Sequence, residues 1–468
     1  MTREICFEDI GGLARRIATK DTTCKEMTRY YLNRINSEND WLCAFVGVYE
    51  CESLRSAIEH DAAFERSKVR SPLSGIPIAV KDLLDIQGRP TSAGSRARGG
   101  GVAGTTSDAV ARLQSAGMTV LGKTHTVEYA FGGWGTNEWM GTPRNPWDPT
   151  IHRIPGGSSS GSAVAVAAGL APCALGTDTG GSVRIPAALN GIVGLKPTKE
   201  LVSLRGCFAL SPTLDSIGPL TRTVLDAETL LRLMLEPSHT ASLDRTYSRL
   251  RAKRIVAVIE DLDDIVALDR DVVALYHRAV DMLQDAGVSI KYVRLPVSLE
   301  EIMEQSGQLV AFEAWQRHRQ YIVDESLPFD PYVRARILAG GLISDDRYSQ
   351  LRAAHLRISK EFAGWMTDYS ALLLPTVPWP ARAVDEIDQS SAEITVFTRL
   401  ANYVHGCAIT IPIGLSTSKL PIGMQLVGGP YADSEILAVG RLLERQANFI
   451  KTHRIPVRDI PEALAKPG

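Results

Sequence analysis

Residues 155–186 read PGGSSSGSAVAVAAGLAPCALGTDTGGSVRIP, in which two glycine- and serine-rich segments enclose an apolar, alanine-rich run. A flexible linker would be flanked by polar sequence, whereas the run from Ala163 to Cys173 has the composition of a buried helix. The wider stretch 130–220 also contains three tryptophans among its glycines and prolines. We therefore predict ordered loops around a site here, not a hinge between domains.

A repeated helix–glycine–strand pattern outside this stretch indicates the architecture. In residues 109–120, and again in residues 279–290, apolar residues at helical spacing end at a glycine suited to a C-terminal cap, and a β-branched strand follows. Units of this kind are typical of α/β domains with parallel strands. No segment with the composition of a linker divides the chain, so we predict a single domain over residues 1–468, with a helical N-terminal part over residues 1–66.

The bulk composition excludes several classes of function. The chain has 468 residues, of which 44% are apolar and 22% charged, as is usual for a globular protein. A net charge of −2 provides no field that would gather nucleic acid or an anionic membrane. The N-terminus does not resemble a signal peptide, and no apolar run approaches the ~18 residues of a membrane span. We expect neither nucleic acid nor membrane as a partner.

The seven cysteines form no C-x-x-C pair, which argues against zinc ribbons and thioredoxin-like motifs. Their spread along a long chain favours reduced thiols packed as small apolar groups, and hence a cytoplasmic protein. The sequence does not determine the oligomeric state, and a homodimer is among the assemblies that it allows.

The first glycine-serine segment admits three interpretations. As a phosphate-binding loop it lacks the Gly-Lys-Ser/Thr ending. Gly157 to Gly161 fits the G-x-S-x-G nucleophile elbow, which would make Ser159 the nucleophile, but that motif needs a preceding strand and residues 153–156 are a poor one. The remaining interpretation is a tight turn that directs serines and backbone amides into a site at the start of a helix.

The second segment, residues 176–186, places Ser182 directly after two glycines. Consecutive glycines let several backbone N–H groups point at one ligand atom. One loop can thus supply a nucleophile and an oxyanion hole, the arrangement that acyl transfer requires, although a sharp β-turn remains an alternative.

A serine nucleophile needs a base, and the residues alone leave its identity open. His125 and His152 are the histidines nearest in sequence, but no histidine lies in a recognisable triad motif. A lysine can serve if burial lowers its pKa, and Lys81 follows the apolar strand predicted over Ile76 to Val80. Set against this, an isolated lysine at a strand end more often lies on the surface.

Taken together, these segments resemble the amidase signature family. The matching motifs are GIPIAVKD at 75–82, GGSS at 156–159, GTDTGGSVRIP at 176–186 and GIVGLKPT at 191–198, flanked by NPWDP at 145–149, DSIGPLTR at 215–222 and LPIGMQLV at 420–427. The family separates its two active serines by 24 positions, as Ser158 and Ser182 are separated here. The resemblance is dense over residues 70–225, the expected core of the active site. One departure is Ser160, where many members have glycine.

This resemblance implies a fold and three catalytic roles. The fold would be a single large α/β/α domain whose central sheet is mixed, mostly parallel and twisted, and covered by helices. Ser182 would be the nucleophile that forms an acyl-enzyme. Ser158, expected after a cis peptide from Gly157, would relay the proton, and Lys81 would be the neutral base.

Supporting roles follow from the same resemblance. Backbone N–H groups of four consecutive residues would form the oxyanion hole: Thr179, Gly180, Gly181 and Ser182. Three further residues would brace the loop: Ser159, Asp178 and Arg184. No metal and no cofactor is expected.

The sequence says less about the residues that would bind the substrate. The resemblance places four residues at the wall of the acyl pocket: Tyr129, Ala130, Phe131 and Trp134. An aromatic wall suits aryl or flat apolar acyl groups, although core packing is the alternative for each residue. Residues 300–345, with Trp315 and the pair Arg334 and Arg336, are expected to cap the substrate. His405 and Cys407 are weaker pocket candidates.

The predicted function is an amidohydrolase that cleaves linear carboxylic amides to an acid and an amine or ammonia. Its partner would be a small-molecule amide. Ester, hydrazide, ureide and carbamate substrates fit the same residues. One alternative is the glutaminase component of a tRNA-dependent amidotransferase, which shares these residues and would need partner subunits. A second is a non-catalytic binding protein on the same fold.

Overall fold

Eleven strands form one sheet in the computed structural model, which describes residues 5–99, 101–236, 254–260, 262, 265–453 and 455. The strand order is β1-β3-β2-β4-β6-β5-β10-β11-β9-β7-β8. The strands are β1 Phe45–Val48, β2 Pro77–Lys81, β3 Thr119–Thr124, β4 Ala174–Asp178, β5 Val193–Lys196, β6 Ser216–Thr221, β7 Ile255–Ile259, β8 Ser289–Val293, β9 Ala371–Pro375, β10 Cys407–Leu415 and β11 Pro421–Gly428.

The direction of the strands corrects one prediction. The sheet is mixed, as expected, but it is not mostly parallel. Among the described strands, four neighbouring pairs are parallel (β2 with β3 and β4, β7 with β8 and β9) and six are antiparallel. The helix–glycine–strand units indicated parallel pairing, but they lead only into β3 and β8. The strands at the centre of the sheet are joined in other ways, including the antiparallel β10–β11 hairpin.

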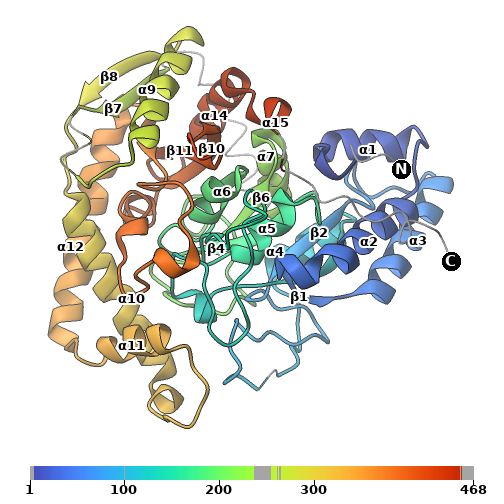
Figure 1. Cartoon of the computed structure of the whole chain (residues 1–468), viewed down its shortest axis with the longest axis horizontal. Helices are drawn as coiled ribbons and strands as arrows, with labels where there is room; N and C mark the ends of the chain where they lie inside the picture. Colours follow the sequence, from blue (N-terminus) through green and yellow to red (C-terminus); the bar gives the residue numbers. More distant parts are fainter. Residues whose placement is uncertain are drawn as a thin grey trace.

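Helices cover both faces of this sheet (Figure 1). The α-helices are α1 Ile10–Ala18, α2 Cys24–Leu42, α3 Glu50–Glu65, α4 Asp108–Ser115, α5 Ser160–Ala167, α6 Arg184–Asn190, α7 Val224–Met234, α9 Arg270–Asp285, α10 Leu299–Ile322, α11 Pro331–Gly340, α12 Asp345–Trp365, α13 Arg399–Tyr403, α14 Asp433–Ala447 and α15 Phe449–Thr452. Short 3-10 helices are η1 Ile5–Phe7, η2 Glu128–Ala130, η4 Met366–Asp368, η5 Val384–Glu386 and η6 Glu393–Thr395.

Alternation along β10 shows how the two faces are covered. Side chains of successive strand residues point to opposite faces. Ile409 and Ile411 lie against Gly440 of α14, whereas Thr410 lies on the side of Gly423, which contacts Ala188 of α6. The strand is therefore buried on both faces, between α14 on one side and α6 on the other.

The two repeated units have the predicted form. Helix α4 is followed by Gly117 (φ +94°) and β3, and helix α9 by Gly287 (φ +78°) and β8. A glycine tolerates these positive φ values without a β-carbon clash, which ends each helix and turns the chain into its strand.

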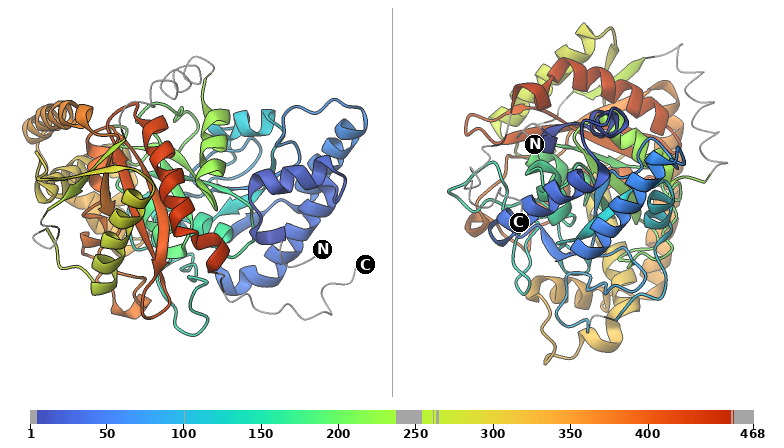
Figure 2. Two further views of the ribbon diagram at one scale, coloured as in Figure 1. Left: turned by 90° about the horizontal axis from the view of Figure 1, so that it is seen from above. Right: turned by 90° about the vertical axis from the view of Figure 1, so that its right-hand side faces the viewer.

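The N-terminal region contains a strand that the sequence analysis did not predict. Helices α1 to α3 occupy one end of the molecule, on the right in Figure 1, and α10 to α12 the other end, as the left view of Figure 2 also shows. Strand β1 lies between α2 and α3 and pairs with β3 at the edge of the sheet. A capping box starts α2, with Thr23 Oγ1 accepting from Glu26 N at 3.1 Å and Glu26 Oε2 from Thr23 N at 2.9 Å.

Within the described ranges, no helix is both long enough and apolar enough to cross a lipid bilayer.

Candidate active site

Lys81 is the last residue of β2, and its side chain is fully buried. Its Nζ atom lies 2.8 Å from Ser158 Oγ and 2.8 Å from Thr177 Oγ1. Thr177 belongs to β4, the parallel neighbour of β2, so the sheet itself holds one of the two partners in place. The apolar strand that ends in lysine thus delivers its amine to the interior and not to the surface.

Burial sets the protonation of this amine. Removal from water lowers the pKa of Lys81 to about 7, against the opposing effects of Cys207 and the carboxylates of Asp178 and Asp215. The adjacent Asp82 does not neutralise it, because that carboxylate pairs with Lys123 at 3.0 Å. Among the described residues, no carboxylate forms an ion pair with Lys81. The site therefore holds a lysine of which about half is neutral at pH 7.

Ser158 faces this lysine, and its neighbour Ser159 contacts the second glycine-rich loop. The peptide bond from Gly157 to Ser158 is cis, as the resemblance implied. Ser158 is fully buried, and its carbonyl accepts hydrogen bonds from Val127 N at 3.2 Å and Thr126 Oγ1 at 3.0 Å. These contacts hold its backbone while its hydroxyl faces Lys81.

Ser159 joins the two loops. Its backbone N donates to the carbonyl of Ser182 at 3.1 Å, and its hydroxyl donates to the carbonyl of Thr177 at 3.2 Å. The segment of Ser158 is thereby fastened both to the strand that supports Lys81 and to the loop that carries Ser182.

A buried ion pair shapes the Ser182 loop. Asp178 ends β4, and its carboxylate accepts from Gly181 N at 2.8 Å and Val183 N at 3.1 Å, as well as from the guanidinium of Arg184 at 3.0 and 3.1 Å. Burial alone would raise the pKa of Asp178, but the charge and hydrogen bonds of Arg184, together with Lys196 and Asn402, outweigh this and hold the pKa below its usual range. The carboxylate thus organises the turn in which Ser182 lies.

This arrangement leaves three of the four expected oxyanion donors available. The N–H of Gly181 is directed at Asp178, whereas the N–H groups of Thr179, Gly180 and Ser182 have no acceptor among the residues that the structure describes. Gly181 has φ +124°, a backbone conformation that a residue with a β-carbon rarely adopts.

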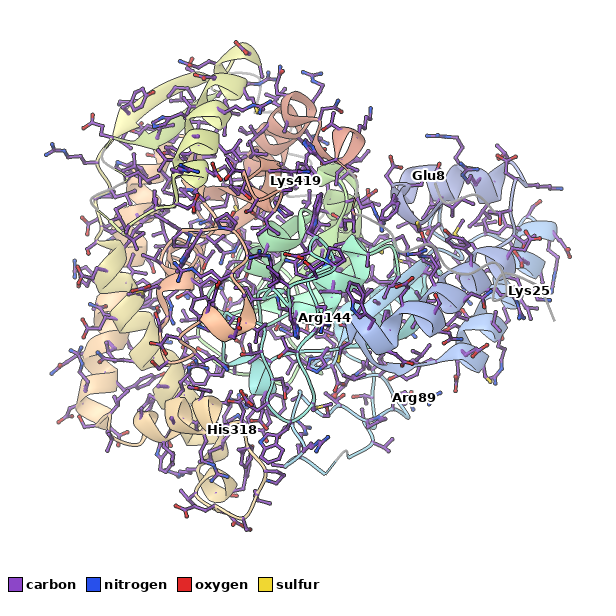
Figure 3. All side chains as sticks on the ribbon, in the orientation of Figure 1. Glu8, Lys25, Arg89, Arg144, His318 and Lys419 are labelled. Carbon is purple, nitrogen blue, oxygen red and sulfur yellow. The ribbon has the colours of Figure 1, made fainter. Side chains whose placement is uncertain are left out.

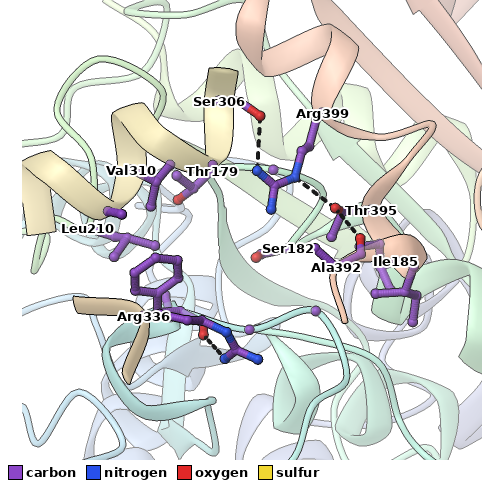
Figure 4. A pocket seen from close by; sticks show the side chains of 18 of the residues that line it. Thr179, Ser182, Ile185, Leu210, Ser306, Val310, Arg336, Ala392, Thr395 and Arg399 are labelled. Atoms are coloured by element: carbon purple, nitrogen blue, oxygen red, sulfur yellow. Dashed lines mark hydrogen bonds between the residues drawn. The ribbon is translucent and has the colours of Figure 1, made fainter. Parts of the chain in front are cut away.

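A cavity of about 250 Å³ opens at Ser182, a residue that is 7% exposed. Figure 4 shows the Ser182 hydroxyl at the centre of this space. The walls come from segments far apart in the sequence: residues 130–133, the loop 179–182, helix α10, Arg336 of α11 and residues 390–399. The arrangement combines a hydroxyl, free amide donors and a neutral amine, which together can carry out acyl transfer.

The comparison with known protein families agrees with this geometry. The model of the Amidase family matches residues 26–437, most of the chain. The chain belongs to the Amidase family. It is accordingly an amidase-signature hydrolase, and the predicted single α/β domain with a mixed sheet is confirmed by solved amidases of the same fold.

Three similar proteins illustrate the range of this family. A glutamyl-tRNA(Gln) amidotransferase subunit from Acidothermus cellulolyticus is 34% identical, over 97% of each chain. 2-Amino-5-chloromuconic acid deaminase from Comamonas testosteroni is 35% identical, over 90% of this chain and 91% of its own. A crystal structure described as an amidase superposes with a TM-score of 0.83 at 32% identity, over 94% of this chain and all of that one.

Of the four residues expected at the pocket wall of this Amidase family member, two line the cavity. Ala130 and Phe131 do so, but Tyr129 and Trp134 are buried elsewhere. Tyr129 and Ala130 both have positive φ, +53° and +61°, and at this turn the Tyr129 ring leaves the cavity to stack on His318 of α10, with centroids 4.8 Å apart. His318 is labelled in Figure 3, beside α11.

Trp134 packs edge-on against Trp379, with ring centroids 5.9 Å apart, and its Nε1 donates to the carbonyl of Ser391 at 3.1 Å. It therefore holds the loop that forms part of the wall, without forming the wall itself. The expected aromatic wall is reduced to Phe131.

Only part of the segment 300–345, which was expected to cap the substrate, lines the cavity. Arg336 lines the cavity, whereas Arg334 donates to the carbonyls of Ile322, Asp324 and Leu327 and so ties α11 to the connection before it. Trp315 packs against the backbone at the end of α11.

The alternative bases and the weaker candidates lie outside the cavity lining. His125 is buried and its Nε2 lies 3.1 Å from the carbonyl of Met140, and His152 is half-buried near the surface loops. His405 packs against His355, with ring centroids 4.6 Å apart, and Cys407 is buried in β10. No hydrogen bond links any of them to Ser158 or Ser182 in the described part of the chain.

Sequence reasoning missed Thr177 and Arg399. Arg399 begins α13, more than 200 residues from Ser182 in the sequence, and no motif marks it. Thr177 stands within the quoted motif, where the alternation of β4 could have placed it on the side of Lys81.

Replacing Gly181 by alanine is expected to lower the free energy of unfolding by about 3 kcal/mol and kcat by about 100-fold. A β-carbon there would lie 2.3 Å from Thr398 Oγ1, at a φ that L-residues avoid. Chemical denaturation and steady-state kinetics measure the two effects. Gly287→Ala is the matched control, because its φ is also positive, +78°, but nothing lies within 4 Å of the added β-carbon. For this variant we expect the free energy of unfolding to fall by about 1 kcal/mol and kcat to stay unchanged. Equal effects in both variants would contradict the role assigned to this loop.

Proposed function

We propose that this protein is an amidohydrolase that cleaves linear carboxylic amides through an acyl-enzyme on Ser182. The observation that carries the proposal is the buried contact of 2.8 Å between Lys81 Nζ and Ser158 Oγ, with no counterion on the lysine among the described residues. Other buried lysines are held differently: Lys123 pairs with Asp82, and Lys196 donates to the backbone carbonyls of Pro197 and Gly406. Lys81 instead faces two hydroxyl groups, one of which belongs to Ser158.

The proton path follows from the hydrogen-bonding capacity of a neutral amine. Such an amine has two N–H donors and one lone pair, so Lys81 can donate to Thr177 Oγ1 and accept a proton from Ser158 Oγ. Ser158 in turn takes the proton of the Ser182 hydroxyl as Ser182 Oγ attacks the amide carbon. The amide oxygen becomes an oxyanion next to the N–H groups of Thr179, Gly180 and Ser182.

Collapse of the tetrahedral intermediate breaks the C–N bond, and Ser158 returns the proton to the departing nitrogen, which leaves as an amine or ammonia. Water then attacks the Ser182 ester, gives up a proton along the same path, and releases the carboxylic acid. Ser159, Asp178 and Arg184 act by holding the two loops and touch no reacting atom.

Capture of the acyl group tests this proposal. Hydroxylamine present during turnover of simple linear amides is expected to yield a hydroxamate, because it competes with water for the acyl-enzyme. Mass spectrometry of the product, and of the peptide that contains Ser182 after rapid acid quench, measures both species. Fast hydrolysis without hydroxamate and without an adduct on Ser182 would show direct attack by water and would overturn the proposal.

The glutaminase role in an amidotransferase is a second candidate function. The similarity to the glutamyl-tRNA(Gln) amidotransferase subunit of Acidothermus cellulolyticus supports it. That function requires partner subunits, so glutaminase activity that appears only when such partners are added would favour it. Robust hydrolysis of small amides by the chain alone would favour the first proposal.

We further propose that residues 300–345 cap the substrate, since helix α10 and Arg336 contribute to the cavity. The proposed partner is a small amide. The seven cysteines are free thiols, which supports a cytoplasmic location.

A further inference from the structure

Among the residues that the structure describes, the cavity beside Ser182 is lined by two arginines and by no acidic residue. Arg399 and Arg336 are the charged members of its lining, as far as the described residues show. Figure 4 places the Ser182 hydroxyl between the two guanidinium groups, which reach the cavity from α13 and α11.

Both arginines are held by neutral groups. Arg399 donates from Nε to Thr395 Oγ1 at 2.7 Å and from Nη1 to Ser306 Oγ at 3.0 Å and the carbonyl of Met303 at 3.2 Å. Arg336 donates to the carbonyl of Phe131 at 2.6 Å and to that of Gln389. Within the described ranges neither arginine forms an ion pair.

The carboxylate nearest to Arg336 in the sequence binds backbone N–H groups and not the guanidinium. Asp330 caps α11 by accepting from Tyr332 N at 3.0 Å and Val333 N at 3.2 Å. It also accepts from Glu138 N at 3.3 Å. The charge of Asp330 still acts on Arg336, where it opposes the lowering of the pKa by burial. For Arg399, burial and the charge of Arg336 both disfavour the cation, and no carboxylate among the described residues offsets them.

Keeping the Arg399 guanidinium charged in this cavity costs free energy, and a negatively charged ligand can offset that cost. Burial and the nearby charge of Arg336 lower the pKa of Arg399 to about 10, so the guanidinium stays charged at neutral pH although its surroundings disfavour the charge. Arg399 donates its hydrogen bonds from Nε and Nη1, so among the described residues its Nη2 atom has no acceptor, and the side chain lines the cavity (Figure 4). A guanidinium so placed is suited to a carboxylate, which it binds through paired N–H groups.

We propose that the substrate of this hydrolase is the half-amide of a short dicarboxylic acid, whose free carboxylate binds Arg399 and Arg336 while its amide carbon lies at Ser182. The inference rests on the proposed amidohydrolase function. A cavity of about 250 Å³ limits the acyl group to a short chain.

The same lining argues against a free amino acid such as glutamine. An α-ammonium group needs an acidic partner, and it would be repelled by two arginines in a site whose described lining has no Asp or Glu. Glutaramate, the monoamide of glutarate, differs from glutamine only in lacking the α-ammonium group. It is therefore expected to be the better substrate.

A set of matched substrates tests the proposal on the full-length enzyme. We expect kcat/KM for glutaramate to exceed that for the neutral diamide glutaramide, and that for L-glutamine, by about 100-fold or more. Arg399→Met and Arg336→Met should each lower the ratio of kcat/KM for glutaramate to kcat/KM for glutaramide at least tenfold, chiefly by raising KM for glutaramate. Arg399→Lys should retain part of the preference for glutaramate. Arg319→Met, an exposed arginine on α10, is the control and should leave the ratio unchanged.

A binding measurement separates this inference from the catalytic proposal. Glutarate should raise the melting temperature of Ser182→Ala, and the Arg399→Met substitution should abolish the rise. Ser182-dependent hydrolysis that is faster for neutral amides, or a substrate ratio that the arginine variants leave intact, would overturn the inference and leave the amidohydrolase proposal standing. Binding of glutarate without hydrolysis of any amide would instead count against the proposed function.

Discussion

Replacing Ser182 by alanine is expected to lower kcat by at least about 10⁴-fold, the scale seen when a covalent nucleophile is removed. The loop that carries Ser182 would keep its shape, because its hydrogen bonds run through backbone atoms and Asp178. Substrate binding should therefore persist, and KM should change little. Steady-state kinetics on the best amide substrate, with thermal unfolding to verify the fold, measure the effect.

Ser160→Ala provides a matched control for this prediction. Ser160 lies two residues after Ser158, is fully buried, and its Oγ has no hydrogen-bond partner in the described structure. Removal of this hydroxyl should leave kcat within about threefold of the wild-type value. The free energy of unfolding should be unchanged or slightly higher, because a buried hydroxyl without a partner is unfavourable. Hydrolysis that survives in Ser182→Ala, or equal losses in the two variants, would show that Ser182 is not the nucleophile.

Replacing Lys81 by methionine is expected to lower kcat by about 10³- to 10⁴-fold. Methionine fills a similar volume but cannot accept the proton that passes through Ser158. Lys81→Arg should be equally inactive, because a guanidinium remains protonated at any pH at which the protein is folded. Wild-type kcat/KM should fall tenfold per pH unit below about 7, since the lysine must be neutral to act.

Stability measurements distinguish this role from a structural one. In the unfolded chain a lysine is protonated below about 10.4, whereas in the fold Lys81 remains neutral down to about pH 7. The unfolded state thus binds more protons across this window, and the lysine makes the folded protein less stable as the pH falls. Lys81→Met lacks this effect, so its melting temperature relative to wild type should be higher at pH 7.5 than at pH 10. The opposite trend would indicate a charged, stabilising lysine.

Much of the catalytic side of the site could be predicted from the sequence. The apolar strand before Lys81, the glycines around Ser182 and the spacing of the two serines are local or motif-based signals. The structure shows the contact of Lys81 with Ser158, the cis bond before Ser158 and the ion pair of Asp178 and Arg184, while the catalytic roles stay predictions. Gly181 alone departs from its expected role, because its N–H binds Asp178.

The substrate side could not be predicted in the same way. Tyr129 and Phe131 are two residues apart, yet one packs against α10 and the other lines the cavity, because the chain turns through positive φ between them. Nothing in the sequence near Arg399 indicates that it lies opposite Ser182. The sequence also failed to predict that most strand pairs are antiparallel, because each helix–glycine–strand unit indicates the direction of one connection and not of the whole sheet.

By itself, the sequence determined the family and the class of hydrolase, and it predicted the catalytic roles of Lys81, Ser158 and Ser182, because these depend on residue types at covalently set spacings. Tertiary structure alone decided that Lys81 lies without a counterion in the described part of the chain, and that two arginines from separate helices face the same cavity. Burial and the pairing of charges arise when distant segments pack together. They set the pKa of the base and the charge of the substrate site, and no stretch of the chain encodes them on its own.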